Sequence, residues 1–125
     1  MRQILFLFLL IFLGINGYGQ NSELAKGCKQ VDAIYRILVE TIEVGAPTYN
    51  SGNYAGCYKI YEGASYKILH LHGKKCKLIR QELEEALERA HETKYNAGEK
   101  AWILRLAFDN ILGVPTTTGE RLKRS

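Results

Sequence analysis

The residues with the strongest ligating chemistry stand close together near the middle of the chain. His70, His72 and Cys76 form an H-x-H-x3-C pattern, and imidazole and thiolate are ligands for zinc or haem iron. However, histidines two positions apart point to different sides of a helix, and a fourth ligand requires His91 to fold over. We expect solvated histidines at a helix end and no cofactor. A metal- or haem-binding periplasmic protein is one alternative function.

Residues that could support catalysis form no recognised motif. Five glutamates resemble paired carboxylates for acid–base chemistry, namely Glu82, Glu84, Glu85, Glu88 and Glu92. Most stand opposite an apolar helical stripe among arginines, which is typical of a solvated, ion-paired face. Cys57 sits on an apolar stripe, where thiols are usually inert. The sequence has no G-x-S-x-G, HExxH or phosphate-binding glycine loop. We therefore expect no enzyme, with a small enzyme of unrecognised class as an alternative.

Tyrosines and asparagines gather around one predicted turn. Exposed aromatic rings beside amides suit recognition of a peptide or protein partner. The residues predicted to bind such a partner, including two polar positions on the preceding helix, are Tyr49, Asn50, Asn53, Tyr58, Arg36 and Glu40. The competing interpretation makes these tyrosines packing residues with hydrated hydroxyls. Tyr58 is expected off the apolar stripe of its helix, and therefore on the surface.

The first twenty residues resemble a secretory signal. A short basic start precedes an unbroken apolar run over residues 4–13, and small and polar residues follow over 14–20. The run is too short to span a bilayer. We predict cleavage after Gly19, which leaves Gln20 as the new N-terminus. The protein is then secreted or periplasmic, with no membrane anchor after cleavage.

Length and charge limit what the remainder can be. About 105 residues suffice for one domain with a modest core. Residues 21–113 carry a formal net charge of only +1 with both signs interspersed, which argues against nucleic-acid binding. The predicted organisation is a signal peptide over 1–19, one helical domain over 20–113 and a mobile basic tail over 114–125.

Apolar periodicity predicts two helices in the first half of this domain. The first follows Ser22 and ends at Gly45 and Pro47, because proline disfavours helical backbone in the residue before it. Its apolar stripe is Leu24, Cys28, Val31, Tyr35, Leu38 and Ile42. The second begins at an N-cap, Asn53, and closes at Gly73. Its stripe is Tyr54, Cys57, Tyr61, Ala64, Ile68 and Leu71.

Two further helices follow with clearer boundaries. A third stripe is Cys76, Ile79, Leu83, Ala86, Leu87 and Ala90, and a fourth is Ala101, Leu104, Phe108 and Ile111. Asn96 and Glu99 have the spacing of a capping box at the start of the fourth helix. No segment alternates long enough to predict a strand. The fold class expected is therefore all-α, a compact antiparallel four-helix domain.

Part of the first hairpin resembles a known family. Residue types and spacings from the turn through the second helix match the tetratricopeptide pattern at Gly52, Tyr54, Cys57, Tyr61 and Ala64. Gly45 lies where that family prefers a small residue. The resemblance covers residues 45–64 and implies a repeat-like helical hairpin used for partner binding. No second copy appears at the family's period, so a compact domain is expected instead of a solenoid.

Three cysteines follow the signal, which suggests one disulfide in an oxidising compartment. In an antiparallel hairpin centred near residue 48, Cys57 lies level with Val39, more than ten residues along the helix from Cys28. At about 1.5 Å per residue a disulfide cannot span that offset. Cys76 opens the third helix at the end of the hairpin that also holds Cys28. The sequence therefore predicts a Cys28–Cys76 disulfide, with Cys57 reduced and buried.

Overall fold

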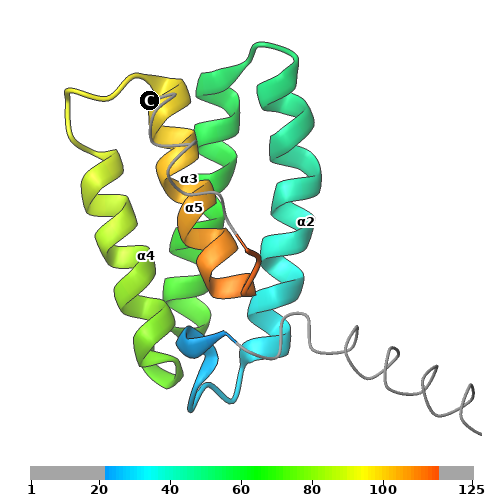
Figure 1. The fold of residues 1–125 in the computed structure, drawn as a ribbon, viewed down its shortest axis with the longest axis vertical. Helices are drawn as coiled ribbons and strands as arrows, with labels where there is room; N and C mark the ends of the chain where they lie inside the picture. The colour runs from blue at the N-terminus through cyan, green and yellow to red at the C-terminus, as the bar shows by residue number, and fades with distance from the viewer. Residues whose placement is uncertain (1–21, 116–125) are drawn as a thin grey trace, which may run out of the picture.

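The fold of residues 22–115 is all-α in a computed structural model of the chain (Figure 1). Its elements are α2 (Val31–Asn50), α3 (Tyr54–His72), α4 (Lys77–Ala90) and α5 (Ala97–Leu112), with short 3-10 turns η1 (Glu23–Ala25) and η2 (Gly73–Lys75). No strand occurs within these residues. The predicted signal peptide and residues 116–125 of the predicted tail lie outside the part described.

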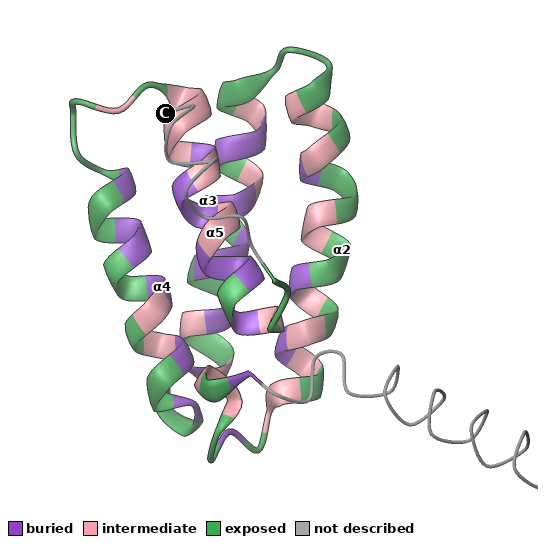
Figure 2. Ribbon diagram, viewed as in Figure 1, coloured by how far each residue is buried: buried purple, intermediate pink, exposed green. Residues whose placement is uncertain are grey.

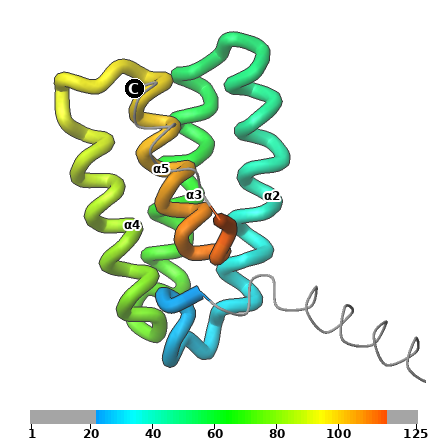
Figure 3. The backbone as a smooth tube through the Cα atoms, in the orientation of Figure 1, coloured from blue at the N-terminus to red at the C-terminus, as the bar shows by residue number. Residues whose placement is uncertain are grey.

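Helix α3 lies at the centre of the bundle. It packs most extensively against α2 and α5, and α5 also packs against α4 (Figure 3). Apolar side chains from all four helices meet along this centre, where Leu38, Ile68, Leu83 and Phe108 are almost completely buried. The outward face of α4 is mostly exposed (Figure 2). This arrangement leaves α2 and α5 as the two walls beside α3.

Helix α2 begins later than its sequence pattern predicts. The chain first forms η1, and Gly27 then takes the left-handed conformation with φ of 72°, which interrupts helical hydrogen bonding. Leu24 and Cys28 therefore precede the helix, although both still contact the core. The predicted start of the first helix was wrong because a glycine turn competes with the apolar stripe.

Helix α2 also ends later than predicted, since Pro47 lies inside it and the helix continues to Asn50. Proline removes one helical hydrogen bond, the one to the carbonyl of Glu43. Glu43 and Pro47 are both exposed, so water can satisfy this carbonyl. The Thr48 hydroxyl donates to the carbonyl of Val44 at 2.8 Å one turn earlier. The proline is thus tolerated near the end of the helix.

The other helix boundaries follow their local signals. The Asn53 side chain accepts a hydrogen bond from the Gly56 amide at 2.9 Å and caps α3. Asn96 and Glu99 form the predicted capping box at the start of α5. Gly113 ends α5 with φ of 72°. These contacts satisfy terminal backbone groups that the helices cannot satisfy internally.

The buried face of α3 is wider than its predicted stripe. Tyr58 was expected on the surface, but it is buried, as is Ser65. Tyr54 and Leu71 were placed on the apolar stripe, and both are exposed. A helix that packs against three others buries more of its circumference than a helix with one partner. The single-stripe assumption was therefore wrong for this central helix.

A disulfide joins Cys28 to Cys76, as predicted. It links the segment before α2 to the residue before α4. Cys57 is free and buried, also as predicted. None of the helices within residues 22–115 is long and apolar enough to cross a membrane.

Candidate functional site

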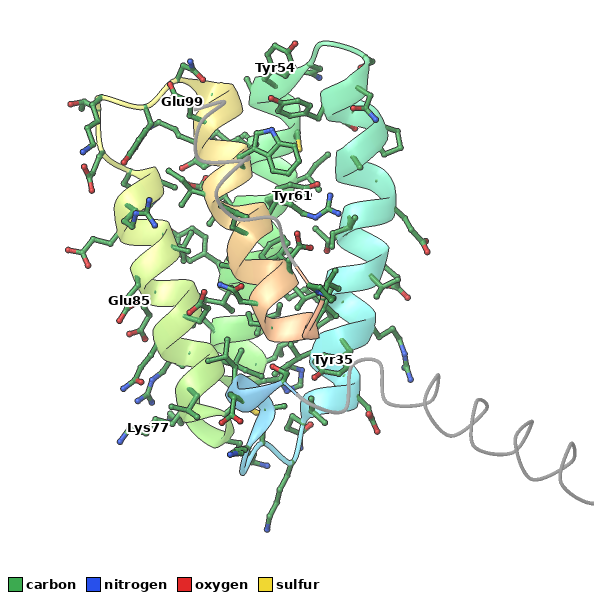
Figure 4. All side chains as sticks on the ribbon, viewed as in Figure 1. Tyr35, Tyr54, Tyr61, Lys77, Glu85 and Glu99 are labelled. Atoms are coloured by element: carbon green, nitrogen blue, oxygen red, sulfur yellow. A yellow bond between two sulfur atoms is a disulfide. The ribbon has the colours of Figure 1, made fainter. Side chains whose placement is uncertain are left out.

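The principal candidate site is a pocket of about 170 Å³ near one end of the bundle. Helix α3 forms its floor, and α2 and α5 form its walls. Its lining residues are Ala46, Tyr49, Asn50, Cys57, Tyr61, Ala101, Trp102 and Arg105. Figure 4 shows Tyr61 on the floor, between α5 and α2. We refer to these eight residues as the α2–α5 pocket.

Gly45 allows the floor of the pocket to pack against α2. A Cβ atom at this position would lie only 2.9 Å from Cζ of Tyr61 and closer still to Cε1. The Tyr61 ring therefore occupies the space that any other residue at position 45 would need. The same ring packs edge-on against Phe108, with ring centroids 5.2 Å apart. Tyr61 is thus fixed between α2 and α5.

Aromatic rings form the mouth of the pocket. Tyr49, in the last turn of α2, lies 5.8 Å from Trp102 on α5 in an edge-to-face arrangement. Its ring also lies 4.5 Å from that of Tyr54, at the start of α3. Such ring pairs add stabilisation beyond their buried area. The mouth is therefore mainly aromatic, with Asn50 also in the lining of the pocket.

The base of the pocket holds two groups that stay protonated at neutral pH. Burial raises the pKa of Tyr61 to about 12, the neighbouring Cys57 adds to the shift, and Arg105 opposes it. Burial also raises the pKa of the Cys57 thiol. A thiol in this state is a poor nucleophile, because the reactive species is the thiolate.

One charge reaches the pocket, and it is already paired. Arg105 Nε lies 3.1 Å from Oδ1 of Asp109 one turn along α5. Asp109 is only 2% exposed. Burial disfavours the charge on the Arg105 guanidinium, but Asp109 and Tyr61 together outweigh this effect and raise its pKa. The pair holds the guanidinium in place and largely neutralises it.

A shallower concave surface of about 710 Å³ continues from the mouth of the pocket. It shares Tyr49, Asn50 and Trp102 with the pocket. It extends over the start of α5, where Asn96, Ala97, Gly98 and Glu99 line it. The pocket and this shallow surface are therefore neighbours that share three lining residues.

The chemistry of the pocket suits binding. Its lining contains neither a carboxylate nor a histidine that could act as a general base, and its thiol and phenol remain protonated. A cavity of about 150 Å³ accommodates a group the size of benzene, whereas sites for drug-sized ligands span about 300–1,000 Å³. The pocket therefore matches a single apolar side chain.

The residues predicted to bind a partner do not all come together. Tyr49 and Asn50 line the pocket, and Asn53 caps α3 at the adjacent helix start. Arg36 and Glu40 are exposed on α2, but they precede Tyr49 by thirteen and nine residues. At about 1.5 Å per residue these offsets are about 20 and 14 Å. These two residues therefore lie outside the pocket, and their part in partner binding stays a prediction.

Tyr58 does not belong to this surface either. Its hydroxyl donates to a carboxylate oxygen of Glu62 at 2.6 Å, and Lys100 lies 5.7 Å from its ring centroid. Burial and the bond to Glu62 raise its pKa. Tyr58 therefore packs in the core, where it satisfies its hydroxyl within α3.

The histidine and cysteine cluster is not assembled as a ligand set. The sulfur of Cys76 is bonded to Cys28 and is unavailable as a thiolate. Nε2 of His91 lies 2.9 Å from a Glu62 oxygen. Among residues 22–115, no three His, Cys, Asp or Glu side chains are placed to hold a metal ion.

Sequence reasoning missed the contribution of α5 to the pocket. Ala101 appeared as a core residue, and Trp102 only as a neighbour of the apolar stripe. Arg105 follows Trp102 by three residues, so both occupy one face of the helix. A bulky aromatic residue beside a charge on one helix face could have indicated a binding pocket there. The residues of α2 that complete the pocket are set by how the helices pack, which the sequence does not show.

Comparison with known proteins gives no relative: no family model, curated protein or solved structure matches this chain.

Proposed function

We propose that this chain is an exported, non-enzymatic helical module that binds a peptide segment of a partner. An aromatic or branched apolar side chain of the peptide enters the α2–α5 pocket, and the flanking residues lie on the adjacent shallow surface. The single observation that carries this proposal is a pocket the size of one side chain, with an aromatic mouth and a buried floor. In this proposal the α2–α3 pair acts as the tetratricopeptide-like hairpin.

Specificity in this proposal comes from few polar groups. The Asn50 amide stands at the junction of the deep pocket and the shallow surface, where it can donate to and accept from a peptide backbone. The aromatic mouth supplies contact area at low cost in conformational entropy. Arg105 is engaged with Asp109, so the pocket should not prefer an anionic side chain.

Export is supported by the basic, apolar and small-residue order of residues 1–20 and by the disulfide, because such bonds persist in oxidising compartments. N-terminal sequencing of secreted or periplasmic material should begin near Gln20. Recovery of a chain that retains Met1 from the cytoplasm would contradict this proposal.

The binding proposal is tested by peptide display on the immobilised protein. Selected peptides should share one aromatic or branched apolar position, and alanine at that position should weaken binding at least tenfold, about 1.4 kcal/mol. The Tyr49→Ala/Asn50→Ala variant should weaken peptide capture more than it lowers the melting temperature, because the loss of the Tyr49 ring pairs also costs some stability. A variant that loses stability yet keeps its peptides would show that these residues are structural.

A further inference from the structure

Positive charge is concentrated at the end of the bundle opposite the pocket. The residues concerned are 23–32, before and at the start of α2, and 67–77, from the end of α3 to the start of α4; we call them the basic end. The Cys28–Cys76 disulfide joins these two segments. In Figure 4, Lys77 lies at one end of the bundle and Tyr54 and Glu99 lie at the other.

The basic end contains six lysines and two acidic residues, a formal charge of +4. The rest of the described chain, residues 33–66 and 78–115, has seven basic and ten acidic residues, a charge of −3. The six lysines, all exposed, are Lys26, Lys29, Lys67, Lys74, Lys75 and Lys77. The near-neutral total therefore conceals a strong separation of charge along the bundle.

Local interactions in the fold explain only part of this lysine cluster. Of the six, only Lys26 has an ion pair within residues 22–115, at 2.8 Å from Glu23. Lys77 occupies the first turn of α4, which has no acidic residue and no side-chain cap. Cations near a helix N-terminus oppose the helix dipole, and like charges that lie close together repel. Lys74 and Lys75 instead follow the C-terminal end of α3, where cations are favourable. Ion pairs and helix dipoles therefore account for only part of the cluster, which favours a role in binding an anionic partner.

Two exposed leucines distinguish the kind of anion. Leu71, in the last turn of α3, is 55% exposed, and Leu78, in the first turn of α4, is 38% exposed. They flank the segment that contains Lys74, Lys75 and Lys77. Lysines attract anionic headgroups, while apolar side chains beside them enter the boundary between headgroups and acyl chains. A soluble acidic polymer has no acyl chains for the leucines to contact.

We propose that the basic end docks this protein on an anionic phospholipid membrane surface. The lysines contact headgroups, and Leu71 and Leu78 insert shallowly. Since the α2–α5 pocket lies toward the opposite end, docking leaves its mouth open to a partner. This inference does not depend on the proposed peptide binding.

The test is co-sedimentation of the purified protein with two kinds of vesicle: phosphatidylcholine alone, and phosphatidylcholine with about one-third phosphatidylglycerol. We expect binding to the anionic vesicles only, weakened by added salt because ions screen the lysines. The neutral vesicles also measure any binding by an apolar N-terminus. If the protein does not bind the anionic vesicles more strongly than the neutral vesicles, the proposal is overturned.

Matched variants locate the surface. Lys74→Glu/Lys75→Glu/Lys77→Glu should weaken binding at least tenfold, whereas Lys59→Glu/Arg89→Glu/Lys94→Glu, with the same change in net charge outside the basic end, should have little effect. Equal losses would show that net charge alone matters, and would overturn the proposal. If the glutamate variant does not fold, glutamines at the same three positions replace it.

A variant of the two leucines distinguishes a membrane from a soluble acidic polymer as the partner of the basic end. Leu71→Ser/Leu78→Ser retains all lysines and should weaken vesicle binding severalfold without changing retention on dextran sulfate. Undiminished vesicle binding by this variant overturns the proposal in favour of a soluble acidic polymer as the partner.

Discussion

The disulfide should supply a large part of the stability of this small domain. Cys28 and Cys76 are separated by 48 residues, and closing a loop of that length restricts the unfolded chain by about 4 kcal/mol in the loop-entropy model. Domains of this size are stable by only about 5–15 kcal/mol. Since 1 kcal/mol shifts the melting temperature by about 4–8 °C, Cys28→Ser/Cys76→Ser should melt about 15–30 °C lower.

The assay is urea and thermal unfolding of the wild type and the Cys28→Ser/Cys76→Ser variant, each with and without reductant. Reductant should bring the wild type close to the variant and leave the variant unchanged, because Cys57 forms no disulfide. The slope of the unfolding free energy against urea concentration should also rise on reduction, because an unfolded chain without the crosslink exposes more surface. An unchanged midpoint would show that the disulfide does not stabilise the fold, and a Cys57 crosslink in a non-reducing peptide map would contradict the Cys28–Cys76 pairing.

Two further perturbations test the pocket floor. Gly45→Ala should destabilise the protein by about 1–3 kcal/mol, because the new methyl group overlaps the Tyr61 ring. Gly63→Ala, at a helical glycine with nothing within 4 Å of the added Cβ, should instead stabilise by about 0.5–1 kcal/mol; equal effects in urea unfolding would contradict the close approach. Since the pKa of Tyr61 rises from 10.0 to about 12 on folding, the folded state favours the neutral phenol. Titration of Tyr61 should therefore lower stability by about 2–3 kcal/mol between pH 10 and 12. Tyr61→Phe should lose less stability than the wild type over this range, although Tyr58, whose pKa is also raised, still contributes to the loss.

The features that could be predicted from sequence are those set by local contacts. The capping box of Asn96 and Glu99 and the Asn53 cap depend on residues three positions apart, so their signals survive without knowledge of the fold. The disulfide followed from the helix rise and from the antiparallel hairpin expected of two helices joined by a short turn, because such a hairpin keeps Cys57 far from Cys28. These conclusions needed no detail of how side chains pack between the helices.

The errors arose where packing overrides local preference. Pro47 is tolerated within α2 because Glu43, whose carbonyl it leaves unbonded, is an exposed residue that water can reach. Tyr58 is buried because α3 has neighbours on several sides. The pocket required the approach of α2 to α5 across Tyr61, which depends on Gly45. Trp102 and Arg105 therefore could not be joined to Tyr49 from the sequence.

In the proposed binding mode an apolar side chain of a partner enters the α2–α5 pocket. Trp102 is the single tryptophan of the chain and lines this pocket, so its fluorescence reports entry directly. Ala46→Leu fills the pocket from its half-buried rim, and Ala33→Leu makes the same change at another half-buried position of α2.

The decisive measurement is a fluorescence titration of Trp102 with a display-selected peptide. Burial of one apolar side chain contributes about 1.5–3 kcal/mol, so wild type and Ala33→Leu should show the same saturable change, while Ala46→Leu should bind at least tenfold more weakly. Equal titrations of Ala46→Leu and Ala33→Leu, or no saturable change in the wild type, would contradict the account.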